Sequence, residues 1–285
     1  MHPDQAQVQQ AVYKHRQSTY YFLPNLRVCS EADAVAFVEK RRFVFFWPIS
    51  GVPLPSLWGA AAGDRPVPNN HDDPGHITWR WKDNLLGQKK WYYTKLLRKK
   101  STIISLGFIE NFFALSDSAF HTIEDLEYLH RIGKRTRVEL EIFSLLLMSG
   151  ALDAITIREK IKSTLSYSTA DFNRAMERLQ TGLNIVPMGI AQTGRWHYAY
   201  IYDVVERLYP EILAHAYNIS KSIAHEKILS AYFQSNGSAS FSDIKKLFQW
   251  EKSDIYDTVN LLQEKGVILA YPPAQDSFFV LARLV

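Results

Sequence analysis

The clearest pattern in the chain is a helical repeat of apolar residues that runs directly into two strand-like segments, between residues 168 and 203. Ser168 precedes the repeat as a helix cap, and Gly182 ends it. The apolar residues on this helix face are Phe172, Met176 and Leu179. Residues 184–190 and 195–201 are rich in β-branched and aromatic side chains, and Ala-Gln-Thr-Gly between them favours a hairpin turn. A helix followed directly by a hairpin is typical of a winged helix-turn-helix unit.

The same arrangement recurs later in the chain, so that two copies run from the predicted helix at 138–149 to the last residue. Each copy has a helix, a second helix, a turn, a third helix and strands. In the first copy the second helix is expected to begin at Thr156, with Glu159 placed to complete a capping box. In the second copy it is expected to begin at Ser240, with Asp243 in the same place. The matching apolar positions are Leu146 and Leu229, Ile161 and Ile244, Phe172 and Ile255, Met176 and Val259, Leu179 and Leu262, and Ile185 and Ile268.

Elsewhere the pattern predicts helices but does not reveal a third copy. The later copy is expected to end in a helix at 253–265, a strand at 267–271, a turn at 272–276 and a closing strand at 277–285. Earlier helices are expected at 5–22 (a polar helix or arm), 30–42, 57–62, 103–115 and 122–132. Together these elements predict a mainly α fold with small β-hairpins, of the α+β class, built from tandem winged helix-turn-helix domains.

One segment, residues 43–63, carries no charge and is long enough to resemble a membrane span. It contains five prolines and glycines before its last residue, and a single span could not replace the backbone hydrogen bonds that they remove. We therefore expect it to form buried core or a pocket wall.

Composition indicates a globular protein, since 47% of the 285 residues are hydrophobic. The formal net charge is only +4, so a nucleic-acid-binding surface would need local clustering of cations. Cys29 is the single cysteine, which excludes an internal disulfide and suits a reducing compartment. The polar amino terminus lacks a secretory pattern. We expect a cytoplasmic monomer without membrane association.

The strongest basic segment is residues 79–100, where no acidic residue follows Asp83. Interleaved tryptophans and tyrosines could stack on bases while the cations neutralise phosphates. Alternatively, the segment is an amphipathic helix whose Trp91, Leu96 and Leu97 face the core while the lysines are solvated. The candidate contacts are Arg80, Lys82, Lys89, Lys90, Lys95, Arg98, Lys99 and Lys100.

The predicted third helices and the hairpin supply further candidate DNA contacts. In a winged helix the third helix enters a groove while the wing and the helix ends hold phosphates. The alternative is that the same units only pack together or bind proteins. The candidates are Asn173, Arg174, Thr169 and Arg178 on the earlier helix, Arg195, Trp196 and His197 on the hairpin, and Lys252, Ser253 and Tyr256 on the later helix.

Residues 63–78 have turn composition and contain two histidines and two aspartates, His71, Asp72, Asp73 and His76. Their spacing matches no closed metal site, so a solvated loop is the favoured interpretation and no metal or other cofactor is expected.

Three segments, 31–60, 79–100 and 183–213, resemble the AlkZ/YcaQ family of winged-helix bacterial DNA glycosylases, which act on alkylated bases and interstrand crosslinks. The resemblance is to its AlkZ-related branch and extends over roughly residues 30–285. It implies three tandem winged-helix units around a DNA-binding channel. The implied domains are an arm at 1–30, a divergent first unit at 31–133, a central unit at 134–218 and a last unit at 219–285.

The resemblance also implies a catalytic Gln-x-Gln motif, but the matching stretch of this chain, residues 43–57, contains no glutamine. A histidine that the family carries after an aromatic-tryptophan pair is replaced by Trp81. Activation of water at an anomeric carbon needs a polar group within reach, so glycosylase activity is in doubt, and no catalytic residue is assigned. A flipped base would need an aromatic pocket, for which the candidates are Trp47, Trp58, Trp79 and Trp81.

Three functions follow as alternatives. The first is a tandem winged-helix protein that binds double-stranded DNA and recognises or helps to repair damage. The second is an active alkylbase or crosslink glycosylase that uses other residues. The third is a transcription regulator or a protein-interaction scaffold.

Overall fold

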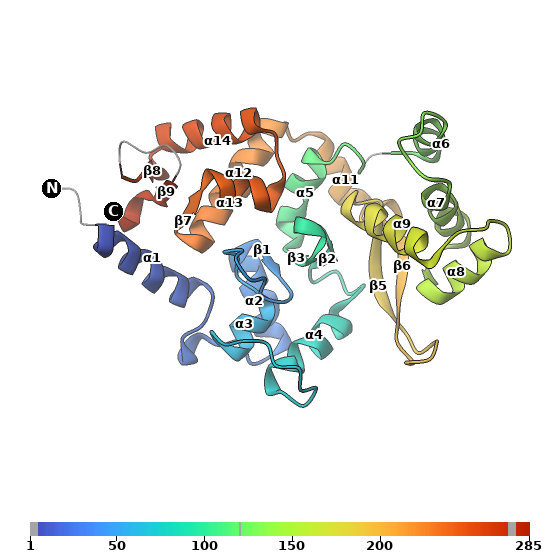
Figure 1. The fold of residues 1–285 in the computed structure, drawn as a ribbon, viewed down its shortest axis with the longest axis horizontal. Coiled ribbons are helices and arrows are strands. Elements are labelled where there is room, and N and C mark those ends of the chain that lie inside the picture. Colours follow the sequence, from blue (N-terminus) through green and yellow to red (C-terminus); the bar gives the residue numbers. More distant parts are fainter. Residues whose placement is uncertain (1–4, 120, 273–277) are drawn as a thin grey trace.

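Three small antiparallel sheets, each with its own set of helices, follow one another in a computed structural model that describes residues 5–119, 121–272 and 278–285 (Figure 1). In each sheet the strand that is last in sequence lies in the middle, in the orders β1-β3-β2, β4-β6-β5 and β7-β9-β8. Each set contains a helix, a strand, two helices and two strands in that order. This is the topology of a winged helix, so the predicted fold class is confirmed, and the three sets are called the first, second and third units.

The first unit was not visible as a repeat in the sequence. Its elements are α2 (Glu31–Arg41), β1 (Phe43–Phe45), α3 (Leu57–Ala62), α4 (Ile77–Leu85), β2 (Tyr92–Lys95) and β3 (Ser101–Ile104). Ser30 and Ser56 accept hydrogen bonds from the first turns of α2 and α3, as caps. The uncharged segment 43–63 supplies β1 and α3, and Phe43, Phe45 and Trp58 are buried, as expected.

The second and third units are the two copies predicted from the repeat. The second unit has α7 (Arg137–Ser149), β4 (Leu152–Asp153), α8 (Ala154–Lys162), α9 (Thr169–Thr181), β5 (Ile185–Ala191) and β6 (Ala199–Val204). The third unit has α12 (Lys221–Asn236), β7 (Ser238–Ser240), α13 (Phe241–Phe248), α14 (Lys252–Glu264), β8 (Ile268–Ala270) and β9 (Phe278–Leu281). The turn predicted at 272–276 lies largely outside the described residues.

The remaining helices connect the units or lie against them. They are α1 (Gln5–Thr19), α5 (Leu106–Leu115), α6 (Ile123–Arg131), α10 (Val205–Leu208) and α11 (Pro210–Tyr217), with short 3-10 turns at Pro24–Leu26, Pro74–His76, Leu97–Lys99 and Ala282–Leu284. No helix among the described residues is both long and apolar enough to cross a membrane.

Capping chemistry sets several of these helix starts. Ser168 with Asp171, and Ser240 with Asp243, form the reciprocal bonds of a capping box. The predicted box at Thr156 is wrong, because Asp153 caps α8 one turn earlier and accepts bonds from the backbone at Ile155 and Thr156. An aspartate that ends a strand was therefore the better signal for the start of this helix.

The predicted boundaries of one strand and one helix also needed correction. The second strand of the hairpin was expected at 195–201 but occupies Ala199–Val204, because Gly194 and His197 take positive φ angles and extend the turn. The helix expected at 103–115 begins only at Leu106, since Ser101–Ile104 is the central strand of the first sheet.

Burial follows the repeat, but the units do not have three separate cores. The second unit encloses its own cluster, which includes Leu146, Phe172 and Leu179. The first unit has a cluster of its own around Trp81. It also shares a continuous cluster with the third unit, α5 and part of β5, in which Phe43 lies with Leu229. Helix α5 packs on α12 and joins them, while α6 packs on α7. The domain boundaries at 133 and 218 stay a prediction.

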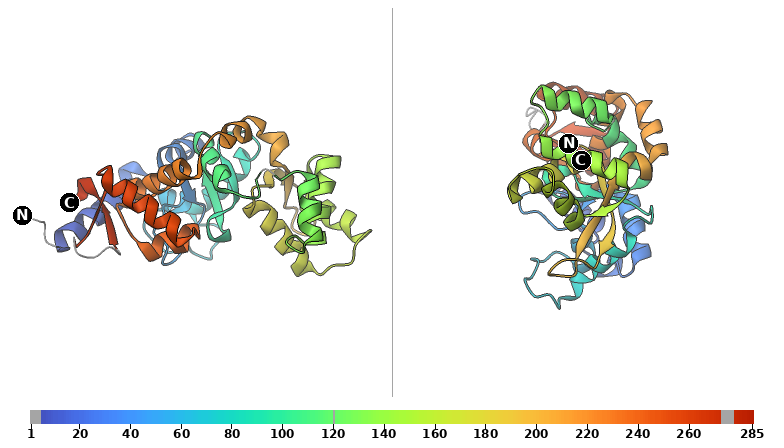
Figure 2. Two further views of the ribbon diagram at one scale, coloured as in Figure 1. Left: turned by 90° about the horizontal axis from the view of Figure 1, so that it is seen from above. Right: turned by 90° about the vertical axis from the view of Figure 1, so that its right-hand side faces the viewer.

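The amino-terminal helix α1 is not a free arm, because it contacts the end of α12 and lies beside the carboxyl-terminal end of the chain (Figure 1, Figure 2). Val8 and Val12 are buried against Val280. Arg16 donates to the Asn236 carbonyl at 2.8 Å, where α12 ends. The helix thereby covers the carboxyl-terminal end of α12 and one edge of the third unit.

Candidate nucleic-acid interface

A basic turn of the first unit lies where the three units meet. This turn, residues 95–100 between β2 and β3, is called the first wing. It packs against α9 of the second unit and α13 of the third. Lys95, Arg98, Lys99 and Lys100 are exposed on it. The amphipathic helix considered for residues 79–100 is present only as α4, which ends at Leu85, although Trp91 and Leu97 are buried as that alternative required.

The wing borders a groove of about 750 Å³ between the second and third helices of the second unit. Lys95 reaches it from the first wing, and α8 and α9 form its two sides. It is called the central groove. Its charged lining residues are Lys95, Arg158, Lys162, Arg174, Glu159 and Glu177. Asn173 and Arg174, predicted as contacts, lie here together with Lys95, whereas Arg158 and Lys162 were missed.

Local contacts hold the cations of the central groove in place. The Arg158 guanidinium lies 4.8 Å from the centre of the Phe172 ring and donates to Asn173 Oδ1 at 3.2 Å. Of the two carboxylates, Glu177 forms an ion pair with Lys99 at 2.9 Å. The arrangement leaves Lys95 and Lys162 exposed at the groove. Their charge could neutralise an anionic backbone.

The hairpin turn of the second unit, residues 192–198, is called the second wing and borders the same region. Thr193 donates to the Asp153 carboxylate at 3.3 Å, which ties the turn to the start of α8. Trp196 at its tip is 81% exposed, and the Arg195 guanidinium lies 5.4 Å from the Trp196 ring centre. Arg195, Trp196 and His197 are therefore presented to solvent, as the sequence predicted.

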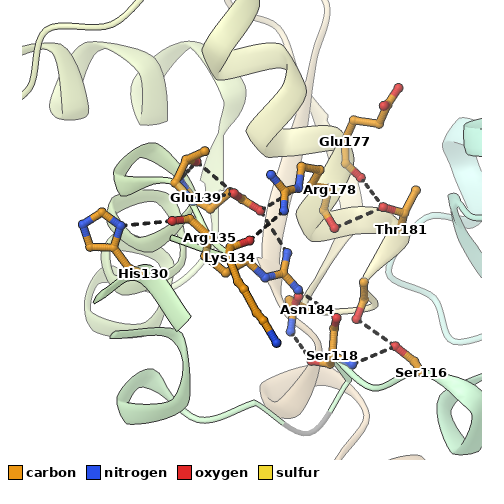
Figure 3. A network of polar contacts seen from close by, with 12 residues as sticks. Ser116, Ser118, His130, Lys134, Arg135, Glu139, Glu177, Arg178, Thr181 and Asn184 are labelled. Carbon is orange, nitrogen blue, oxygen red and sulfur yellow. Dashed lines mark hydrogen bonds and ion pairs between the residues drawn. The ribbon is translucent and has the colours of Figure 1, made fainter. Parts of the chain in front are cut away.

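In the carboxyl-terminal half of α9, Arg178 joins a network of polar contacts with α7 and the residues before it (Figure 3). The buried Glu139 carboxylate pairs with Arg135 at 2.9 Å and with Arg178 at 3.3 Å. Arg178 also donates to the Lys134 carbonyl, and Arg135 donates to Ser118 Oγ at 2.8 Å. Arg178 is exposed, as predicted, but this network also ties it to the segment that precedes α7.

The prediction of Lys82 as a DNA contact is corrected by the structure, because its side chain is only 1% exposed. Its ammonium group donates to Tyr198 Oη at 3.0 Å and to Tyr200 Oη, and it pairs with Asp83 at 2.8 Å. Burial lowers the pKa of Lys82, which the Asp83 carboxylate partly offsets. An ammonium enclosed by these partners and aromatic rings cannot serve as a surface phosphate contact. Instead it fixes α4 to the second wing.

The four tryptophans proposed as a base pocket divide into two groups. Trp47 lies 6.2 Å from Trp58 and 6.1 Å from Trp79 between ring centres, and His76 lies 5.4 Å from Trp47. Trp58 is fully buried, while Trp79 is 43% exposed. Trp81 is buried in the core of the first unit, against which Trp47 also packs.

The other predicted contacts are dispersed. Arg80 lines a separate groove of about 810 Å³ beside the 63–78 loop. Lys89 lies near Glu211 of α11, at 3.8 Å, and Lys90 is exposed in the same turn. Lys252, Ser253 and Tyr256 are exposed along α14. In the loop itself, Asp73 pairs with Arg65, and its hydrogen bond from that guanidinium lowers the pKa of the carboxyl group.

The fold and these grooves define a protein of the tandem winged-helix class. Comparison with known proteins is consistent with this class: the sequence matches the model of the family described as AlkZ related over residues 28–249. The chain belongs to the AlkZ-related family. Among solved structures it is similar to the Streptomyces sahachiroi DNA glycosylase AlkZ, with a TM-score of 0.55 and 10% identity, over 96% of this chain and 70% of that one. No curated protein matches the sequence.

Proposed function

We propose that the protein binds double-stranded DNA as a monomer, through the central groove and the two wings beside it. The main observation behind this proposal is that cations from two units line one groove. Lys95 comes from the first wing, and the others, from the second unit, are Arg158, Lys162 and Arg174. The third helix of a winged helix commonly enters a DNA groove, and wings commonly hold phosphates. Membership of the AlkZ-related family supports the same function.

We further propose that the preferred substrate is damaged or distorted duplex. Trp196 stands exposed at the tip of the second wing, beside the guanidinium of Arg195. An apolar side chain at such a tip can insert between base pairs that are already unstacked, where the cost of separating them is lowest. The similarity to a DNA glycosylase supports the same preference.

Salt-dependent binding to duplex DNA tests the central groove. Lys95→Gln and Lys162→Gln should each reduce affinity and lower the slope of log affinity against log salt concentration by about one. Lys14→Gln makes the same change of charge on the exposed face of α1, far from the groove, and should leave the slope unchanged. A wild-type affinity that does not respond to salt would contradict the proposal and would favour a protein-interaction scaffold.

Substitution at the wing tip tests the preference for damage. Trp196→Ala should reduce the ratio of affinities for mismatched or nicked duplex over intact duplex, while changing the affinity for intact duplex little. Equal losses on both substrates would mean that Trp196 is a general contact.

A second candidate function is excision of damaged bases by residues other than the glutamines of related enzymes. One observation favours it: Asp83, 18% exposed, accepts from Tyr198 Oη at 2.9 Å and lies next to the exposed Trp79 on α4. A carboxylate beside an aromatic surface is an arrangement that could orient water toward a flipped base. Release of free base from alkylated or crosslinked duplex, abolished by Asp83→Asn, is the expected result. Tight binding without release would leave only DNA binding.

A further inference from the structure

A second cluster of cations lies away from the central groove, between the first helices of the first and third units. It lines a pocket of about 300 Å³, to which α2 contributes its last residues and α12 one side. None of the residues that line it belongs to α8, α9, α13 or α14. The charged residues of the pocket are Lys40, Arg41, Arg42, Lys227 and Glu226.

Three of the four cations of this pocket have no ion pair among the described residues. Its one carboxylate, on Glu226, is paired with Lys265. Arg42 pairs with Glu39 outside the lining. No ion pair to Lys40, Arg41 or Lys227 is found among the described residues. Like charges held together in this way repel one another unless an anion lies between them.

One polar group in the pocket is also buried without a hydrogen bond. Arg41 Nε is shielded from solvent and has no acceptor. Burial, with a smaller effect from Arg283, lowers the pKa of Arg41. A buried donor without an acceptor is costly, so the described residues leave the Arg41 guanidinium short of acceptors.

The dipole of α2 explains only part of the cluster. The negative end of a helix favours cations in the last turn, which accounts for Lys40 and Arg41. It does not account for Lys227, which comes from the middle of a different helix and lines the same pocket. Ser230 and Gln234, one and two turns further along α12, add neutral hydrogen-bonding groups to the lining.

We propose that this pocket is an anion site for a phosphate group, held by Arg41, Arg42 and Lys227. The phosphate belongs either to a nucleic-acid strand or to a free phosphate or nucleotide, and the two sources share the same chemistry of recognition. The site is separate from the central groove and does not depend on the function proposed for that groove.

Titration of the full chain with inorganic phosphate, followed by backbone amide NMR signals, tests the site without DNA. Phosphate should shift the signals of residues 40–42 and 226–234 and should saturate, whereas chloride at matched ionic strength should not shift them. Lys227→Gln should weaken phosphate binding by about tenfold, the effect of one charge-assisted hydrogen bond. Lys160→Gln, an equal change of charge on the exposed surface of α8, should not. Unshifted signals, or equal affinity in Lys227→Gln, would overturn the proposal.

The same titration with a duplex oligonucleotide in place of inorganic phosphate identifies which molecule supplies the bound phosphate group. If DNA shifts the same signals and Lys227→Gln weakens that effect, a strand supplies the phosphate. If only phosphate or a nucleotide shifts them, the ligand is a small molecule. Since the phosphate titration contains no DNA, failure of DNA binding at the central groove would not be mistaken for failure of this site.

Discussion

At the scale of single residues, buried tyrosines are the main polar groups that the fold must keep neutral. Tyr92 is fully buried with no hydrogen-bond partner for its hydroxyl, and burial raises its pKa well above the usual value. Tyr209, whose ring centre lies 5.4 Å from that of Tyr92, has its pKa raised by burial to about 12. Both groups must remain protonated in the folded chain.

Stability should therefore fall in alkaline solution. The unfolded chain releases phenol protons near pH 10, before the folded chain does, so each such group removes up to about 1.4 kcal/mol per pH unit between about 10 and 12. Tyr92→Phe removes an unpaired buried hydroxyl and should raise the free energy of unfolding at pH 7 by about 1 kcal/mol. The same substitution should also reduce the loss of stability in alkaline solution. Urea unfolding at pH 7 and 10.5 measures both, with the exposed Tyr13→Phe as control.

The buried carboxylate of Glu139 gives a second prediction. It is fully buried between Arg135 and Arg178, so Glu139→Gln leaves Arg135, itself 9% exposed, without its counter-charge. We expect a loss of about 3 kcal/mol in the free energy of unfolding. Glu141→Gln breaks an exposed pair with Arg137 on the same helix and should cost under about 1 kcal/mol. Equal losses in the two variants would show that the Glu139 network contributes little.

Residue patterns in the sequence predicted these environments unevenly. Apolar periodicity placed Phe172 and Leu179 in a core correctly, because helical spacing alone decides which face is buried. Lys82 was misassigned because its partners come from far away in the chain, Tyr198 lying 116 residues later. The residues next to a lysine in a basic segment do not indicate that tyrosines from another unit will enclose it.

At the scale of elements, the contact between the first and second units depends on a glycine. Gly87, just after α4, has a φ of +71°, and a Cβ there would lie 2.3 Å from the carbonyl oxygen of Met188 in β5. A side chain would therefore be strained and would also push β5 away.

Gly87→Ala should lower the free energy of unfolding by about 2 kcal/mol. It should also speed hydrogen exchange in β5 and at the second wing, because Lys82 and Gly87 hold the same contact. Gly107→Ala is the matched control, since Gly107 lies inside α5 with nothing within 4 Å of the added Cβ. That substitution should be neutral or stabilise by up to about 1 kcal/mol. A neutral Gly87→Ala would mean that β5 can move aside at no cost.

Element boundaries could be predicted where capping side chains mark them, and less well at turns. Ser30, Thr122 and Ser168 were assigned correctly as caps because a hydroxyl before an apolar run has one common structural use. The strand after the second wing was predicted about four residues early because nothing in the sequence indicated that His197, a non-glycine residue, would take a positive φ.

At the scale of the whole molecule, the repeat predicted two units and the family resemblance implied the third. What the sequence could not supply was how the units meet. The first wing lies between α9 and α13, and cations such as Lys95, Arg158 and Lys162 come together only through that packing. Arg158 and Lys162 were missed because candidate contacts were sought on the third helices and the hairpin, where a winged helix usually meets DNA.

The division of the cores predicts how the molecule unfolds. Leu146 and Leu229 are equivalent positions of the repeat, and both are completely buried, but Leu146 lies in the separate core of the second unit. Leu229 lies in the core that the first and third units share. Truncation of either to Ala should cost about 3 kcal/mol, the usual loss for a leucine removed from a packed core.

The two substitutions should destabilise different parts of the chain. Leu229→Ala should speed hydrogen exchange in both β1 and α14, although β1 belongs to another unit, because local stability follows shared contacts more than sequence. Leu146→Ala should speed exchange in α9 and leave α14 unchanged. Native-state hydrogen exchange with mass spectrometry measures this. If Leu229→Ala leaves β1 protected, the first and third units unfold separately, and the continuous apolar cluster between them is a contact of two domains and not a common core.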